Sequence, residues 1–291
     1  LYGDINYWWV MNDKGNIHTE SSGEPIGMEI RAQAFSFSSN DEINNMTFYN
    51  YELINRGTQT LYNTFFGFFT DGALGNPNDD YVGCDVNRGL AYYYNGANYD
   101  GDVSGFKGYG YSPPAVGVDF FEGPYQDNDG IDNAFGIGEN EALNGIGYGD
   151  GVIDNERFGM RRFLYYSNTT NGANPNQTDP IKATDYYNYL QGKWKDGTPF
   201  YYGGSGHISD PDANTSIESD FMFPGDTDPL GWGTGGVPQE PWTEQTAGNV
   251  PNDRRFLQSA GPFILKPGSV NNITVGVCYA RSTDVDPFAP V

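Results

Sequence analysis

Thirty residues near the middle of the chain hold its densest group of side chains that could bind a metal ion. The segment 127–156 reads DNDGIDNAFGIGENEALNGIGYGDGVIDNE and contains two similar phrases, DGIDN and DGVIDN. A hard cation such as Ca²⁺ takes six to eight oxygen ligands, which carboxylates, amide side chains and backbone carbonyls supply. Glycine between the acids lets the backbone turn tightly enough to bring several oxygens to one point. The composition of this segment therefore predicts calcium binding.

The candidate ligands form two groups, one in each phrase. Gly130 takes the tight turn of the first group and Ile131 anchors that loop on apolar surface, while Gly151 takes the tight turn of the second. Neither phrase is a full EF-hand, because a twelve-residue loop with either glycine at its sixth position has no acidic residue at its first or last position. We expect two short irregular loops that share one ion, and the alternative is a pair of Asp-Gly turns with solvated carboxylates. The predicted site comprises Asp127, Asp129, Ile131, Asp132, Asp150, Asp154 and Glu156.

Two further groups are weaker candidates for calcium. The segment 70–85, TDGALGNPNDDYVGCD, places four aspartates between two expected strands. The segment 210–214 begins with the one, three, five spacing of a calcium loop, but Thr215 stands where that loop needs glycine and Phe221 where it needs glutamate. Turn formation by Asp and Asn is the competing explanation for both groups. Their candidate residues are Asp71, Asp79, Asp80, Asp85, Asp210, Asp212 and Asn214.

Catalytic chemistry has less support in the sequence. His18 and His207 are the only histidines, which excludes a multi-histidine zinc or iron centre. The segment 203–207, GGSGH, resembles a serine nucleophile loop but lacks its final glycine and a preceding strand. A pair of acids for glycoside hydrolysis could exist among 38 carboxylates, but nothing in the sequence selects one. The tryptophans that could stack on sugars, or belong to the core, are Trp8, Trp9, Trp194, Trp232 and Trp242.

The charge of the chain limits its partners. Fifteen Lys and Arg against 38 Asp and Glu give a formal net charge of -23. Nucleic acid and anionic membrane surfaces would both repel such a chain, whereas bound cations would relieve repulsion between its carboxylates. No apolar run approaches the length of a membrane span and no signal peptide is recognisable. We expect the sequence to be a processed product or a segment of a longer protein.

Composition and alternation predict an all-β fold. Forty glycines supply turns, and 22 Tyr, 19 Phe and 5 Trp suit pleated surfaces. Apolar residues alternate over 273–279, which predicts a strand that pairs in the same sheet system as the N-terminal strands. We predict a single domain over 1–291, a β-sandwich of the jelly-roll or immunoglobulin-like type. Its loop-rich insertion, at about 122–254, contains one short helix and is expected to be stabilised by calcium.

Individual strands can also be located from the sequence. Residues 28–34 alternate between apolar and polar, and the parity then shifts at Phe35, which predicts a β-bulge. The segments 46–55 and 61–70 are rich in strand-forming residues. Gly57 lies between them, so we expect these two strands to form a hairpin.

One helix and two cysteines complete the sequence predictions. Asp179 can cap a helix whose first turn contains Pro180 and which ends at Gly192. Cys84 and Cys278 are far apart in sequence. A disulfide between them and a pair of buried free thiols both stay open.

Several long segments together resemble part of large extracellular proteins of gliding and marine Bacteroidota. In chain order these segments are NDEINNMTFYNYELINR, DDYVGCDVNRGLAYYYN, PPAVGVDFFEGP, the DGIDN and DGVIDNE pair, DYYNYLQGKWKDGTP, FMFPGDTDPLGWGTGG and NDRRFLQSAGPFILKPGSVNNITVGV. Those proteins are similar to cargo of the type IX secretion system, which usually ends in a sorting domain. The resemblance implies an extracellular or outer cell-surface location, and it implies no particular activity.

These observations lead to one functional expectation and one alternative. We expect a calcium-stabilised structural or adhesive β module of a secreted or cell-surface protein, without catalysis. Its partners would be other domains or further copies of a larger surface protein, with neither nucleic acid nor membrane insertion. The alternative is a carbohydrate-binding module or a glycoside hydrolase domain, for which glycans would be the partners.

Overall fold

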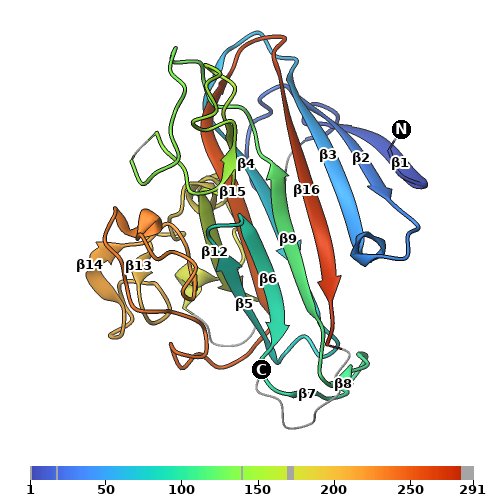
Figure 1. The fold of residues 1–291 in the computed structure, drawn as a ribbon, viewed down its shortest axis with the longest axis vertical. Helices are drawn as coiled ribbons and strands as arrows, with labels where there is room; N and C mark the ends of the chain where they lie inside the picture. Colours follow the sequence, from blue (N-terminus) through green and yellow to red (C-terminus); the bar gives the residue numbers. More distant parts are fainter. Residues whose placement is uncertain (1, 18, 139, 169–173, 283–291) are drawn as a thin grey trace.

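The chain folds mainly into antiparallel strands, and the largest sheet has seven of them (Figure 1). The computed structural model describes residues 2–17, 19–138, 140–168 and 174–282. The order in the large sheet is β1-β2-β3-β16-β9-β6-β5, with β1 and β5 at its two edges. Its strands are β1 (Ile5–Asn12), β2 (Met28–Ser36), β3 (Met46–Asn55), β5 (Asp80–Asp85), β6 (Leu90–Asn95), β9 (Ala115–Glu122) and β16 (Val270–Ala280).

A second sheet of three strands packs on one face of the first. Its order is β12 (Arg162–Ser167), β15 (Arg254–Leu265) and β4 (Leu61–Asp71). Aromatic rings join the two layers: Phe66 lies 5.9 Å from Phe120, and Tyr93 lies 4.8 Å from Phe256. The predicted all-β sandwich is confirmed.

The C-terminal strands connect the two ends of the chain. β16 pairs with β3 on one side and with β9 on the other, as its alternation predicts. β15 pairs with β4, so the second sheet also joins distant parts of the sequence. The region 122–254 is more than an excursion of loops, because its strand β12 forms one edge of that second sheet.

Two local predictions about strands are wrong. β3 and β4 do not form a hairpin around Gly57, because β3 pairs with β2 and β16 whereas β4 pairs with β15. The chain crosses from one sheet to the other at this turn. β2 has no bulge, since its pairing with β3 runs without a shift to Phe35 opposite Phe48. These two rings stack at 5.3 Å, so the change of apolar parity reflects a second apolar face of the sheet.

The one α-helix among the described residues, α1 (Ala183–Leu190), begins three residues later than predicted. The carboxylate of Asp185 accepts hydrogen bonds from the backbone N–H groups of Ile181 and Lys182, both at 3.0 Å. The predicted Asp179 therefore does not cap the helix. Gly192, with a φ of 75°, follows its end as predicted.

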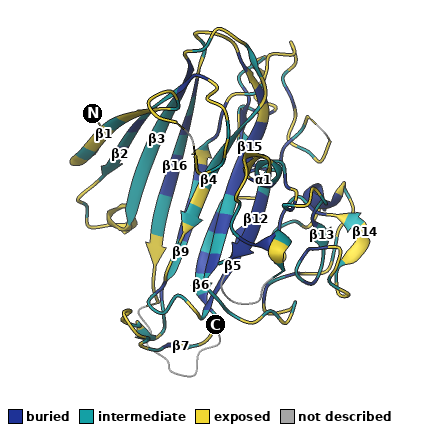
Figure 2. Cartoon of the chain, turned by 180° about the vertical axis from the view of Figure 1, so that it is seen from behind, coloured by how far each residue is buried: buried dark blue, intermediate teal, exposed yellow. Residues whose placement is uncertain are grey.

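The loop-rich middle of the chain has an aromatic core of its own. Trp194 is fully buried and packs on Phe200 at 4.7 Å and on Tyr165 of β12 at 6.1 Å. Trp242 packs on Phe223 at 5.0 Å. Figure 2 shows buried residues beside β13 in this region, next to the main sandwich, whereas β14 is mostly exposed. Much of the order in this region therefore comes from packed rings.

The remaining elements are short. Three 3-10 helices and six small strands support the loops: η1 (Glu42–Asn45), η2 (Pro175–Gln177), η3 (Trp232–Thr234), β7 (Tyr99–Asp100), β8 (Gly110–Tyr111), β10 (Gly145–Ile146), β11 (Arg157–Phe158), β13 (Tyr201–Tyr202) and β14 (Asn214–Glu218). Within the residues described above, no helix is long and apolar enough to cross a membrane.

Both cysteines are free thiols. Cys84 is buried in β5, and its Sγ donates to the carbonyl oxygen of Met222 at 3.4 Å. Cys278 lies in β16 and is half-buried. Of the two alternatives left open by the sequence, the structure has no disulfide and shows one buried and one half-buried thiol.

Candidate functional site

The two acidic phrases meet in space, and we call residues 127–133 and 150–156 the acidic loop pair. Asp154 Oδ1 accepts from the backbone N–H groups of Asp129 at 2.8 Å and Gly130 at 2.9 Å. Asp132 Oδ2 accepts from the N–H of Gly151 at 2.7 Å. Each loop therefore holds the backbone of the other through a carboxylate.

Each loop also fixes its own turn in the same way. Asp129 Oδ1 accepts from the N–H of Ile131 at 2.9 Å, and Asp150 Oδ1 accepts from the N–H of Val152 at 2.8 Å. The amide of Asn155 donates to Asp150 Oδ2 at 2.9 Å. The repeated phrases thus fold into two matching Asx turns.

The remaining predicted ligands anchor the pair to the rest of the molecule. Glu156 is 2% exposed, and its Oε1 accepts from the N–H of Asn133 at 2.5 Å. Asp127 Oδ1 accepts from the N–H of Ile264, in β15, at 2.7 Å. The side chain of Ile131 is exposed, so the prediction that it anchors the loop on apolar surface is wrong. The Asx turn directs it outward.

The acidic loop pair retains oxygen atoms that nothing in the structure satisfies. Asp132 Oδ1 and Asn155 Oδ1 are buried and have no hydrogen-bond partner. No Lys or Arg in the described parts of the chain forms an ion pair with the carboxylates of the acidic loop pair. Equally, no three His, Cys, Asp or Glu side chains among the described residues converge as a ready-made metal centre. Asp, Asn and backbone oxygens still match the donor set that Ca²⁺ prefers.

The four aspartates of segment 70–85 do not form one site. Asp71 pairs with Arg255 at 3.1 Å at the end of β4, and Asp85 pairs with Arg88. Asp80 and Asp85 stand at opposite ends of β5, about 17 Å apart at roughly 3.3 Å per residue.

Asp80 is the buried member of that group. It is 0% exposed and lies directly opposite Asn95 in the pairing of β5 with β6. Burial raises the pKa of Asp80 to about 8, the hydrogen bond from Leu74 opposes this rise, and the charges of Asp79 and Asp100 add to it. Burial and the charge of Asp100 also raise the pKa of Asp79.

The segment 210–214 forms a bend. Asp210 accepts from the backbone N–H groups of Ser205 at 2.8 Å and Asp212 at 3.0 Å, while the Asp212 side chain is exposed. Burial favours a higher pKa for Asp210, but these donors outweigh it and the pKa is lowered. Asn214 accepts from the N–H of Ser216 at 3.1 Å. The side chains of Asp210 and Asn214 each serve a turn, as in the competing explanation.

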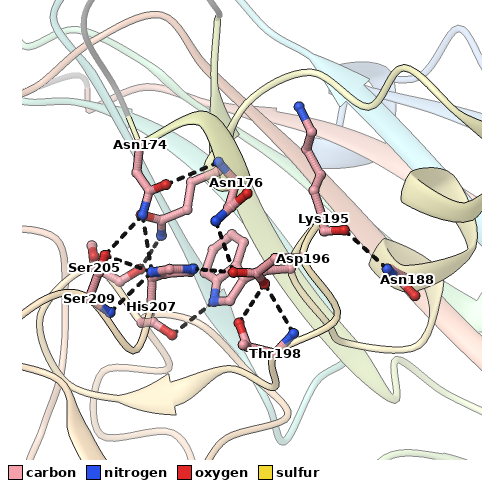
Figure 3. A network of polar contacts seen from close by, with 12 residues as sticks. Asn174, Asn176, Asn188, Lys195, Asp196, Thr198, Ser205, His207 and Ser209 are labelled. Atoms are coloured by element: carbon pink, nitrogen blue, oxygen red, sulfur yellow. Dashed lines mark hydrogen bonds and ion pairs between the residues drawn. The ribbon is translucent and has the colours of Figure 1, made fainter.

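A Ser–His–Asp arrangement that the sequence did not reveal surrounds His207 (Figure 3). His207 is 4% exposed; its Nε2 lies 3.0 Å from Asp196 Oδ2 and its Nδ1 lies 2.8 Å from Ser209 Oγ. The sequence pointed to Ser205 instead, whose carbonyl oxygen accepts from Gln177 at 2.6 Å. The turn that brings Ser209 back onto the ring carries no recognisable motif.

The surroundings of His207 indicate a structural network. Its Nδ1 faces three donors, because the N–H of Ser209 at 3.1 Å and the amide of Asn174 at 3.0 Å join the Ser209 hydroxyl. Three donors that share one ring nitrogen hold the imidazole in a fixed position. The network ties the 194–198 turn to the 203–209 turn, beside the buried ring of Trp194.

An aromatic cavity lies between α1 and the outer face of the small sheet. Its volume is about 520 Å³. Arg255 pairs with Asp179 of its wall at 2.7 Å. No sequence motif marks this cavity, because its residues come from four separate segments. They are Gly67, Phe69, Tyr166, Asp179, Pro180, Tyr186, Tyr189, Leu190 and Leu257.

The tryptophans do not form a sugar-binding platform. Trp194, Trp232 and Trp242 are buried, whereas Trp8 is 65% exposed on the edge strand β1. Trp9 is half-buried on the same strand. The exposed rings that line the cavity are phenylalanine and tyrosine instead.

No known protein family matches the chain, and no curated protein matches it at a significant level.

Proposed function

We propose that this chain is a structural or adhesive β-sandwich module of a secreted or cell-surface protein, and that Ca²⁺ stabilises its acidic loop pair. The observation that carries the proposal is the geometry of that pair. Its two halves interlock through carboxylates, yet Asp132 Oδ1 and Asn155 Oδ1 are buried without a partner. One free oxygen from each half suits a cation shared between them.

Exposed apolar side chains on the acidic loop pair, and on the chain between its two loops, support an adhesive or assembly role. Contiguous apolar surface on a soluble module commonly marks a contact with another protein. We infer that these loops contact other domains or further copies of a larger surface protein. The exposed residues are Ile131, Phe135, Ile137, Ile146, Val152 and Ile153.

The proposed location, extracellular or on the outer cell surface, agrees with this chemistry. Irregular oxygen sites in extracellular modules bind Ca²⁺ with dissociation constants of about 10⁻⁴–10⁻³ M. Such affinity is useful only where free calcium is abundant. The net charge of -23 also favours cations over nucleic acid as partners.

Chelation tests the proposal. Free Ca²⁺ at a hundred times its dissociation constant stabilises the folded state by about 2.7 kcal/mol. Removal by EDTA should therefore lower the melting temperature of this 291-residue chain by about 4–5 °C. It should also open protease cleavage between Tyr125 and Arg157, because the carboxylates then repel one another and few apolar contacts hold the loops.

Asp129→Ala should reproduce part of this effect in the presence of calcium. The matched control is Asp102→Ala, which removes another exposed aspartate, one paired with Lys107 at 3.0 Å far from these loops in the sequence. Unchanged melting and unchanged proteolysis on chelation would show that the acidic loop pair is only two acidic turns.

Glycan binding is a second candidate, favoured by the aromatic cavity. Phe69 and Tyr166 stack at 6.2 Å on one wall, and the charged pair of Asp179 and Arg255 lies beside them. Flat rings beside a few polar groups are what sugar recognition requires.

A glycan array followed by a hydrolysis screen tests this candidate. Phe69→Ala should abolish any binding, whereas Tyr62→Ala, at an exposed ring of the same strand outside the cavity, should leave it intact. Turnover of a glycan would instead identify a glycoside hydrolase. Absence of binding across the array would remove this candidate.

A further inference from the structure

A second group of free oxygens lies at the start of β5, and it is separate from the acidic loop pair. Asp79 Oδ1, Asp80 Oδ1 and Asn95 Oδ1 are buried atoms without a hydrogen-bond partner. Asp80 is 0% and Asn95 1% exposed. The group is at the end of the large sheet opposite the loops that follow β9 (Figure 1).

The strand register brings two of these oxygens together. Asp80 and Asn95 are direct partners across β5 and β6, so their side chains leave the sheet on the same face. Tyr93 lies two residues before Asn95, shares this face and packs on Phe256 of the small sheet. The two side chains therefore point into the interior between the sheets.

The other polar atoms of these side chains are already engaged. Asp80 Oδ2 accepts from the N–H of Leu74 at 3.0 Å, and Asn95 Nδ2 donates to the carbonyl oxygen of Ala97 at 2.9 Å. Only the Oδ1 atoms remain free. The amide nitrogen of Asn95 cannot turn toward Asp80 without losing its bond to Ala97.

Four negatively charged side chains interact at this site. Asp100 and Asp253 add their charges to those of Asp79 and Asp80. No Lys or Arg in the described segments forms an ion pair with any of the four. Another buried carboxylate of the chain does have a cationic partner.

Glu244 provides the contrast. It is also 0% exposed, but its Oε2 lies 2.8 Å from the guanidinium of Arg254. A carboxylate buried without such a partner is strongly unfavourable. A bound cation would offset the cost of burying the carboxylates at the start of β5.

We propose that Asp79, Asp80 and Asn95 bind a buried Ca²⁺ ion between the two sheets through their free Oδ1 atoms. The donors are all hard oxygens. Zinc favours thiolate and imidazole ligands, so this donor set does not suit zinc. Mg²⁺ prefers to keep several waters in a strict octahedron, whereas Ca²⁺ accepts irregular sets of protein oxygens. The third ligand is an amide oxygen, and backbone carbonyls or waters complete the shell.

Neighbouring residues hold the surrounding loops in place. Asp100 accepts from the backbone N–H groups of Asn76 at 3.1 Å and Tyr109 at 2.7 Å. Gly75, with a φ of 72°, leaves no space for a Cβ beside the Asp100 carboxylate. Asp100 thus contributes charge near the ion while it fixes the loop between β4 and β5.

A proton shared between Asp80 and Asn95 is the competing explanation. It would satisfy the Oδ1 atoms of these two residues, which are partners across the strands. It would leave Asp79 Oδ1 buried and unpaired. A cation satisfies all three atoms.

Calcium titration of Asp80→Asn tests the proposal, with Asp85→Asn as the matched control. Both variants remove one carboxylate from β5, but Asp85 already pairs with Arg88. Isothermal titration calorimetry should count one Ca²⁺ fewer per chain in Asp80→Asn and an unchanged number in Asp85→Asn. Asp79→Asn, at a less buried position, should weaken the same binding event at least about tenfold.

Melting measurements separate the two explanations. In EDTA, Asp80→Asn should melt at least as high as the parent chain, because the amide needs no counter-charge when it is buried. In calcium it should melt lower, because the ion is lost. An equal rise of the melting temperature in both buffers, with the same number of bound ions, would overturn the proposal in favour of the shared proton.

The assignment of this ion as calcium rests on the proposed function. The two proposed sites can nevertheless be tested separately, because different measurements report on them. If Ca²⁺ does not bind the acidic loop pair, chelation leaves protease cleavage between Tyr125 and Arg157 unchanged. Asp80→Asn still binds one ion fewer than the parent chain in that case. If only the buried site fails, chelation opens that cleavage and Asp80→Asn binds calcium like the parent.

Discussion

Glu244 and Arg254 form the most buried ion pair in the described part of the molecule. Arg254 reaches Glu244 through both Nε and Nη2, and its Nη1 donates to Ser167 of β12 at 2.8 Å. Glu244 Oε1 also accepts from the N–H of Val82, in β5, at 2.9 Å. This one carboxylate therefore joins the loop region to both sheets.

Glu244→Gln should lower the free energy of unfolding by about 3–5 kcal/mol, because Arg254 is left buried without its counter-charge. Urea unfolding measures this change. Glu52→Gln, which breaks an exposed contact of 3.7 Å to Arg31, should cost about 1 kcal/mol or less. Equal losses in the two variants would contradict this account of the buried pair.

Part of the acidic site could be predicted from the sequence alone. The repeated Asp-Gly phrases marked Asp129 and Asp154, since turn chemistry is local. The sequence could not reveal that Asp154 accepts a hydrogen bond from a backbone N–H group 25 residues earlier. Nor could it reveal that Asn95 is the strand partner of Asp80. Those relations depend on strand register and loop closure, and Asn95 belongs to no motif.

At the scale of elements, α1 depends on a carboxylate inside its own first turn. Burial favours a higher pKa for Asp185, but the N–H groups of Lys182 and Ile181 outweigh it and lower the pKa. A carboxyl whose pKa is lower in the folded state stabilises that state above its unfolded pKa, near 4. The contribution is lost as the pH falls from about 4 through the lower, folded value.

Asp185→Ala should therefore lower the free energy of unfolding by about 0.5–2 kcal/mol at pH 7. The difference from the parent chain should shrink below pH 4. Asp185→Asn is the control, because its amide oxygen can still accept from the backbone but does not titrate. Unfolding curves between pH 3 and pH 7 would contradict the prediction if the loss in Asp185→Ala stayed constant.

Elements with a strong local pattern could be located from the sequence. The strands that they pair with were harder to predict. Alternation placed β16 because one face of that strand must be buried. Strand propensity located β3 and β4, but it could not show that the chain changes sheet between them. The start of α1 was misplaced because Pro180 and Asp179 suit a helix start, while Asp185 satisfies the first N–H groups from within.

At the scale of the whole molecule, two sources of order hold the long middle region. Its aromatic core, built around Trp194 and Trp242, needs no ion. The proposed calcium sites lie outside this core, in the acidic loop pair and at the start of β5. Chelation should consequently loosen particular loops while the sandwich and the ring cluster persist.

The order of strands in the large sheet has a mechanical consequence. β1, the first strand of the chain, has one neighbour, whereas β16, the last, is bonded on both sides by β3 and β9. Tension transmitted through the N-terminal strand has to break a single ladder, and tension through the C-terminal strand has to break two. A surface module held between two attachments would thus yield first at β1, and the ribbon it releases would lengthen the tether while the rest of the sandwich still resists the force.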